Sequence, residues 1–138
     1  MEHTGDNLTG EGSGDDEQII VDLQKVPSHI HKLVFVVNIY DCVKRSQHFG
    51  MIENAFIRIV NLTKGKAGLS KILVGLGWDP VASGSGGFFG KLFGGGTPNI
   101  DCDASVLMLE NGRVTENKNV IYFGNLRNLS VYIVKQVK

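Results

Sequence analysis

The chain has 138 residues, with 14 Lys and Arg against 14 Asp and Glu, and 42% of its residues are hydrophobic. This composition fits one globular domain and excludes wholesale disorder or a fibrous repeat. No apolar run approaches the ~20 residues of a membrane-spanning helix, and a net charge of zero argues against a generic nucleic-acid binder.

Short runs of β-branched and aromatic residues, separated by turn residues, predict seven or eight strands and one short helix. Such a set is typical of an all-β protein, an antiparallel β-sandwich, here in a single domain over residues 1–138. The predicted strands are 19–23, 33–40, 55–61, 71–77, 104–110, 113–115, 120–123 and 129–137.

Three of these elements carry specific predictions. The run LVFVVNIY at 33–40 is apolar enough to be a strand buried on both faces. Asp41 is expected to cap one or two helical turns over 41–48. The pair Asn111-Gly112 is typical of a type I′ hairpin turn, in which both central residues have positive φ.

The charge of the chain is unevenly distributed. Residues 1–22 contain seven acidic residues and no Lys or Arg, so this segment carries −7 and the remainder +7. Within it, the run GDNLTGEGSGDDE at 5–17 mixes carboxylates, an amide and a hydroxyl with glycines. Because Ca²⁺ prefers oxygen ligands of these kinds, the run predicts a cation site. A solvated acidic loop is the alternative interpretation.

A second acidic motif, DCDAS at 101–105, opens the predicted strand 104–110. At strand spacing, Asp101, Asp103 and Ser105 share one face and offer three oxygen ligands in a row. A carboxylate pair acting as general acid and base is the enzymatic alternative. No histidine, serine elbow or substrate-binding motif accompanies the pair.

The segment SGSGGFFGKLFGGG at 83–96 is rich in glycine and is predicted to be a long loop. Its four large apolar residues either fold back on the core or form a tip that docks on a partner or a membrane. It is not a phosphate-binding loop, because its Gly-Lys pair lacks the earlier glycine and the following Ser or Thr.

Cys42 and Cys102 share no short-range motif. The acidic N-terminus has no secretory signal, so two reduced thiols and a cytoplasmic location are expected. His29 and His31 do not have the spacing of paired zinc ligands.

Several long motifs together carry a family resemblance. They are HTGDNLTGEGSGDDE (3–17), VFVVNIYD (34–41), QHFG (47–50), NAFIRIVN (54–61), GLSK (68–71), VGLGWD (74–79), NIDCDAS (99–105) and YFGNL (122–126). On these motifs the chain resembles the tellurium-resistance TerD family from residue 2 to about 127. The resemblance implies a C2-like β-sandwich with Ca²⁺ in acidic loops and a role in stress and tellurite resistance. No enzymatic activity is established for the family.

The order of the motifs differs from that of the family. Residues 1–61 resemble the family's later portion and 62–127 its earlier portion, whereas 129–138 form a predicted strand without a counterpart. A circular permutation, natural or engineered, tandem repeats cut out of phase, and a rearranged gene are three explanations. The family's strands that follow NAFIRIVN are missing, so we expect an exposed sheet edge and a homodimer or strand-swapped oligomer.

The resemblance implies Ca²⁺ as the cofactor and a non-enzymatic Ca²⁺-binding function, with protein partners in a stress-response complex and no nucleic acid. The implied metal ligands are Asp6, Asn7, Thr9, Asp15, Asp16, Glu17, Asp101, Asp103 and Ser105. The alternative is a Ca²⁺-dependent module that contacts a protein or a membrane surface through loop 83–96. A third hypothesis is hydrolysis or reduction at an unrecognised site, with Cys42 and Cys102 as the available thiols.

Overall fold

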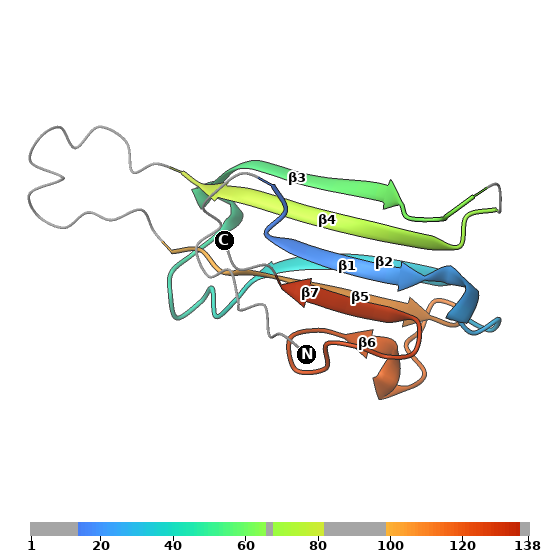
Figure 1. Ribbon diagram of the computed structural model, residues 1–138. Coiled ribbons are helices and arrows are strands. Elements are labelled where there is room, and N and C mark those ends of the chain that lie inside the picture. The colour runs from blue at the N-terminus through green and yellow to red at the C-terminus, as the bar shows by residue number, and fades with distance from the viewer. Residues whose placement is uncertain (1–13, 66–67, 82–98, 136–138) are drawn as a thin grey trace, which may run out of the picture.

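Two antiparallel β-sheets pack face to face in the protein (Figure 1). The structure is a computed structural model, and it describes residues 14–65, 68–81 and 99–135. Within those residues the chain forms seven strands, and its only helical elements are three single 3₁₀ turns. The expected all-β antiparallel sandwich is therefore confirmed.

The four-stranded sheet, sheet A, has the order β3-β4-β1-β7. Its strands are β1 (Glu17–Asp22), β3 (Ile52–Asn61), β4 (Lys71–Pro80) and β7 (Val131–Lys135). Every neighbouring pair in this sheet is antiparallel. The strand predicted at 129–137 is β7, which lies at one edge of the sheet beside β1.

The three-stranded sheet, sheet B, has the order β2-β5-β6, also antiparallel. Its strands are β2 (Lys32–Ile39), β5 (Cys102–Leu109) and β6 (Val120–Ile121). The 3₁₀ turns are η1 (Leu23–Lys25), η2 (Phe49–Met51) and η3 (Asn117–Asn119). Among the described residues, no helix is long and apolar enough to cross a membrane.

The core lies between the two sheets. Ile19 of β1, Val74 of β4 and Val106 of β5 have no exposed surface. A smaller cluster at one end of the sandwich joins Ile39, Trp78, Ile100 and Cys102. Burial of each large apolar side chain contributes roughly 1.5–3 kcal/mol, so these clusters hold the sheets together.

The short helix predicted over 41–48 is wrong, because the segment forms consecutive turns instead. Asp41 has φ +49° and Ser46 has φ +52°. A helix-capping residue has extended dihedrals, so Asp41 in the left-handed region cannot begin a helix. The hydrogen bond from Arg45 N to Asp41 O closes one turn that is not continued.

The strand at 33–40 was expected to be buried on both faces, and this expectation is also wrong. Four of the eight residues of β2 are only half-buried and three are exposed. The predicted hairpin turn is present, with φ +48° at Asn111 and +80° at Gly112. After the turn, however, only a single bridge between Glu110 and Arg113 forms instead of a strand.

Candidate metal centre

The two acidic motifs of the sequence begin two strands that face each other. Glu17 is the first residue of β1 in sheet A, and Asp103 is the second residue of β5 in sheet B. The carboxylate of Glu17 crosses between the sheets and accepts a hydrogen bond from the backbone N–H of Ala104 at 2.6 Å. Residues 87 positions apart in the sequence are thereby brought to one end of the sandwich.

All five carboxylates of these motifs within the described residues are buried. Their exposed fractions lie between 1% and 7%, for Asp15, Asp16, Glu17, Asp101 and Asp103. Taking a carboxylate out of water is costly unless hydrogen bonds or positive charges compensate. For Asp16, part of this compensation is a hydrogen bond from the backbone N–H of Trp78 to Oδ2, at 2.8 Å.

The thiol of Cys102 lies within the electrostatic reach of four of these carboxylates. Burial, followed by the negative charges of Asp101, Glu17, Asp103 and Asp16, raises the pKa of Cys102 to about 12. The same end of the sandwich therefore collects negative charge from both sheets. The thiol itself stays protonated at neutral pH, which makes it a poor ligand and a poor nucleophile.

Asp15 belongs to a different environment from Asp16 and Glu17. Val74 and Leu76 point into the core, so a side chain at Gly75 between them would point to the outer face of sheet A. The Asp15 carboxylate occupies the place that a Cβ on Gly75 would take, so it lies on that outer face. There Arg58 of β3 donates two hydrogen bonds to it, at 2.7 and 2.6 Å. The carboxylate also raises the pKa of Arg58, through these hydrogen bonds and then through its charge.

The other predicted ligands are only partly accounted for by the structure. Asp6, Asn7 and Thr9 lie outside the described residues. Ser105 is half-buried on β5, two residues beyond Asp103. In the described part of the chain, no three His, Cys, Asp or Glu side chains come together as a metal-binding group. A complete ion site therefore needs oxygen ligands from elsewhere in the chain.

Several partners of the acidic residues were not identified from the sequence, among them Gln18, which donates to Asp15 at 2.9 Å. Arg58 binds Asp15, and the backbone N–H groups of Trp78 and Ala104 bind Asp16 and Glu17. Arg58 carries a signal, because it is the one charged residue within the apolar run 55–60. The two backbone donors have none, because their role depends on strand pairing.

Comparison with known protein families matches this chain to the TerD domain in two segments. The sequence profile of that family matches residues 1–67 and residues 60–138. No solved structure shows a significant match.

Three relatives illustrate the extent of the similarity. Stress response protein SCP2 of Bacillus subtilis (strain 168) is 77% identical over 69 residues, which are 50% of this chain and 34% of the relative. General stress protein 16U of the same organism is 58% identical over 59 residues, 43% of this chain and 31% of the relative. Tellurium resistance protein TerD of Serratia marcescens is 56% identical over 59 residues, with the same two shares. The matched part of the chain thus spans about a third of the length of each relative. Because the family profile covers the chain from end to end in two matches, the protein belongs to the TerD domain family.

Proposed function

We propose that the protein is a Ca²⁺-binding domain of the stress response, with a role in tellurite resistance, and that it acts by binding rather than by catalysis. The observation that carries the proposal is the convergence of buried carboxylates from β1 and β5 at one end of the sandwich. The relatives named for stress response and tellurium resistance support the biological context.

The chemistry of the donor set fits Ca²⁺ better than a softer metal. Asp16, Glu17, Asp101 and Asp103 offer carboxylate oxygens, which hard cations prefer. The nearby thiol of Cys102 is held in its protonated form, so a thiolate-binding metal such as zinc gains no ligand there. A bound Ca²⁺ would supply the positive charge that stabilises this group of carboxylates.

Residues 1–13 are expected to complete the ion site. We infer that Asp6, Asn7 and Thr9 add oxygen ligands to Asp16, Glu17, Asp101, Asp103 and Ser105. Asp15 is assigned a structural role instead, because Arg58 occupies both of its carboxylate oxygens.

Isothermal titration calorimetry of the whole chain with CaCl₂ tests this function. We expect binding to the wild type, and binding at least tenfold weaker in Asp103→Asn and in Asp6→Asn. Glu116→Gln is the matched control, because Glu116 is an exposed carboxylate paired with Lys118 at 2.7 Å. This variant should bind Ca²⁺ as tightly as the wild type does. Heats at the level of the buffer, or equal affinity in all four proteins, would contradict the proposal.

Thermal unfolding gives a second readout. If Ca²⁺ binds only the folded chain, a concentration 100 times Kd adds about 2.7 kcal/mol to the free energy of unfolding. The melting temperature should therefore rise with Ca²⁺ and not with an equal concentration of NaCl. Tellurite protection in cells that express a variant without cysteines would separate this function from thiol chemistry at Cys42 and Cys102.

We also propose that the family's motifs stand in a permuted order in this chain. Two separate matches to one domain family, overlapping at 60–67, support this proposal. A cytoplasmic location and contacts with other stress-response proteins remain part of the same proposal. The alternative module, in which loop 83–96 contacts a protein or a membrane, lies outside the described residues.

A further inference from the structure

Among the described residues, the two sheets leave one side of the sandwich without a covering strand. Sheet A has four strands and ends at β3, whereas sheet B has three and ends at β2. In the described part of the chain, β3 pairs only with β4, and β2 pairs only with β5. Both strands therefore present one unpaired edge, and the two edges lie on the same side because β4 packs on β2 through Trp78, Val37 and Ile39.

The inner face of β3 is exposed, although its residues are apolar. Ile57 is opposite Leu76 and Ile59 is opposite Val74, and both of those β4 residues point into the core. Ile57 and Ile59 nevertheless keep 58% and 67% of their surface exposed. The regular part of β3 follows the irregularity between Glu53 and Phe56; it has no Lys or Pro, and its one charged residue, Arg58, is bound to Asp15 on the outer face. This stretch of edge can pair with another chain.

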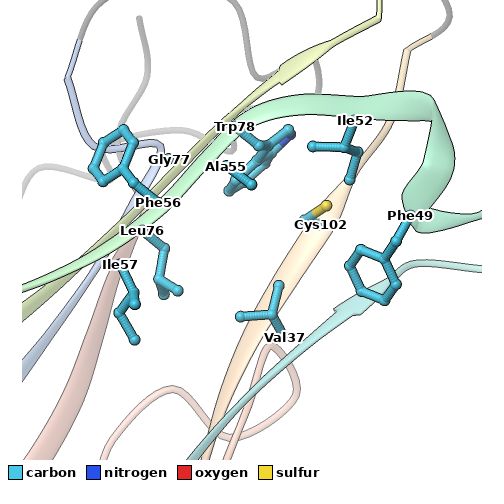
Figure 2. A pocket seen from close by; sticks show the side chains of 10 residues that line it. All are labelled: Val37, Phe49, Ile52, Ala55, Phe56, Ile57, Leu76, Gly77, Trp78 and Cys102. Carbon is cyan, nitrogen blue, oxygen red and sulfur yellow. The ribbon is translucent and has the colours of Figure 1, made fainter.

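An apolar pocket of about 380 Å³ lies beside this face. Figure 2 shows side chains from both sheets around it, including Ile57 of β3, Trp78 of β4 and Val37 of β2. In the part of the chain that the structure describes, no strand of sheet B lies beyond β2 on this side of the pocket. Its lining makes burial of a further apolar side chain favourable.

On both edges, the residues whose backbone N–H and C=O groups point away from the neighbouring strand are the residues whose side chains point inward. Leu62 N donates to Lys71 O, so alternation in an antiparallel ladder turns the N–H and C=O groups of Ile57 and Ile59 away from β4. Likewise Tyr40 N donates to Asp101 O, which leaves the backbone groups of Phe35 and Val37 on the free edge of β2. On each strand, the residues free to pair are those with inward side chains.

We propose that this open side binds a second copy of the chain, as a two-fold symmetric dimer in which β3 of each copy pairs with β2 of its partner. Sheet A of one copy then continues into sheet B of the other, and β3 packs face to face on the partner's β3. Figure 1 shows β3 and β5 running in the same direction, and β2 is antiparallel to β5. A two-fold axis parallel to the strands preserves these directions, so the new β3–β2 ladders are antiparallel.

Other two-fold arrangements either clash or leave the inner face of β3 uncovered. Pairing β2 with the partner's β2 would place the partner's β3 where β4 already packs on β2. Pairing β3 with the partner's β3 edge to edge would leave Ile57 and Ile59 uncovered. In the proposed dimer each copy contributes the ten residues of β3 and the eight of β2. This strip approaches the roughly 20–30 residues a side of a standard interface.

Sedimentation equilibrium of the whole chain from 1 to 100 µM measures the association. We expect a dimer for the wild type and for Leu129→Lys, a control at an apolar residue that is 89% exposed elsewhere on the molecule. Ile59→Lys should raise the dissociation constant at least roughly a hundredfold, because two lysines would meet at the axis. Circular dichroism and a melting curve show whether each variant folds.

A monomeric wild type at 100 µM, whether the edge is empty or covered by another part of the same chain, would overturn the proposal. A dimer that survives Ile59→Lys would overturn it as well, because it must use another surface.

Cysteine crosslinking identifies the arrangement. In a Cys42→Ser background, Ile57→Cys and Ile59→Cys should each be linked between copies by a short bis-maleimide, because packed sheets lie about 10 Å apart, too far for a disulfide. Both positions should react, because an axis along the strand brings each inward residue opposite its own equivalent. Edge-to-edge pairing of β3 with β3 brings at most one position opposite itself, so a crosslink at one of the two positions alone would reject this dimer. Leu129→Cys is the control that should stay uncrosslinked.

Discussion

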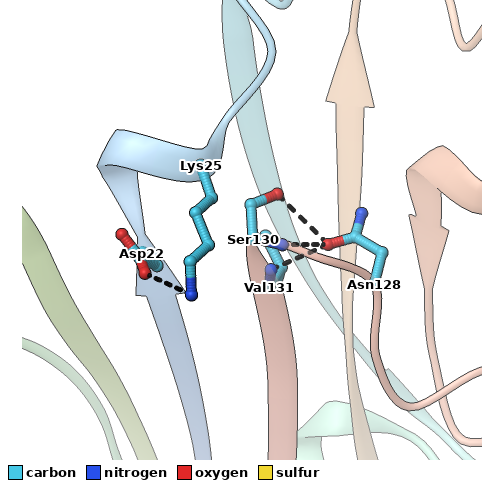
Figure 3. Close-up of polar contacts among 5 residues, drawn as sticks. All are labelled: Asp22, Lys25, Asn128, Ser130 and Val131. Carbon is cyan, nitrogen blue, oxygen red and sulfur yellow. Dashed lines mark hydrogen bonds and ion pairs between the residues drawn. The ribbon is translucent and has the colours of Figure 1, made fainter.

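Replacing Asn128 with alanine should lower the free energy of unfolding more than most single substitutions would. The side-chain oxygen of Asn128 accepts hydrogen bonds from Ser130 N at 2.9 Å, Ser130 Oγ at 3.1 Å and Val131 N at 2.8 Å (Figure 3). Its amide nitrogen donates to Lys118 O at 3.1 Å and lies 3.0 Å from Met108 Sδ. One side chain thereby fixes the turn that leads into β7.

The magnitude follows from the burial of the donors. Ser130 is 2% exposed and Val131 is completely buried, so water cannot easily replace the lost acceptor. A buried donor left without a partner costs about 1–3 kcal/mol. With two backbone donors affected, Asn128→Ala should lose about 2–4 kcal/mol of the roughly 5–15 kcal/mol that stabilises a domain. Asn128→Asp keeps the acceptor but turns a carboxylate oxygen toward the Lys118 carbonyl, so it should lose about 1–3 kcal/mol.

Urea unfolding followed by circular dichroism measures these differences, with Leu129→Ala as the control. Leu129 is 89% exposed, so its truncation should change the free energy of unfolding by less than about 0.5 kcal/mol. A loss in Asn128→Ala within 1 kcal/mol of that in Leu129→Ala would refute the reasoning. The result also bears on the proposed ion site, because β7 pairs with β1, which carries Glu17.

Three further predictions concern charge and thiol chemistry. A hydrogen bond from Lys25 holds the pKa of Asp22 below its ordinary value of 3.8. The stabilisation of the fold by this pair is therefore complete above pH 3.8 and is lost as the pH falls through the lowered pKa. Lys25→Ala should return the pKa of Asp22 toward 3.8 in a carboxyl titration by NMR, and an unchanged pKa would contradict this. In the native protein, iodoacetamide should label the half-buried Cys42 well before the buried Cys102, as mass spectrometry of timed samples would show; equal rates would mean that the core opens readily. Asp15→Asn should lower the melting temperature while leaving the Ca²⁺ affinity within about threefold of the wild type, whereas a tenfold loss of affinity would make Asp15 a ligand.

Local features of the sequence predicted most strands, but not their neighbours. Alternation of apolar residues marked β3, and an apolar run followed by the turn residues Asn111-Gly112 marked β5, because these signals depend only on residues close in sequence. The position of β1 between β4 and β7 depends on contacts between distant segments. Among the described residues no strand lies beyond β2 in sheet B, which accounts for the exposure of β2 and is revealed by no local pattern within 33–40.

The acidic residues at the start of β1 have different partners, which the sequence alone did not predict. Asp15 and Asp16 precede the first residue of β1, so the alternation of faces along that strand does not fix where their carboxylates point. Asp15 turns to the outer face, where Gly75 leaves room and Arg58 reaches it from two strands away. Asp16 and Glu17 instead bond to backbone donors of β4 and β5, beside Asp101 and Asp103. The run therefore divides into one carboxylate that ties β3 to the start of β1 and two that bond to backbone donors of β4 and β5. Strand alternation would place Asp15 on the same face as Glu17, so of the local signals only the lone charge of Arg58 indicates this division.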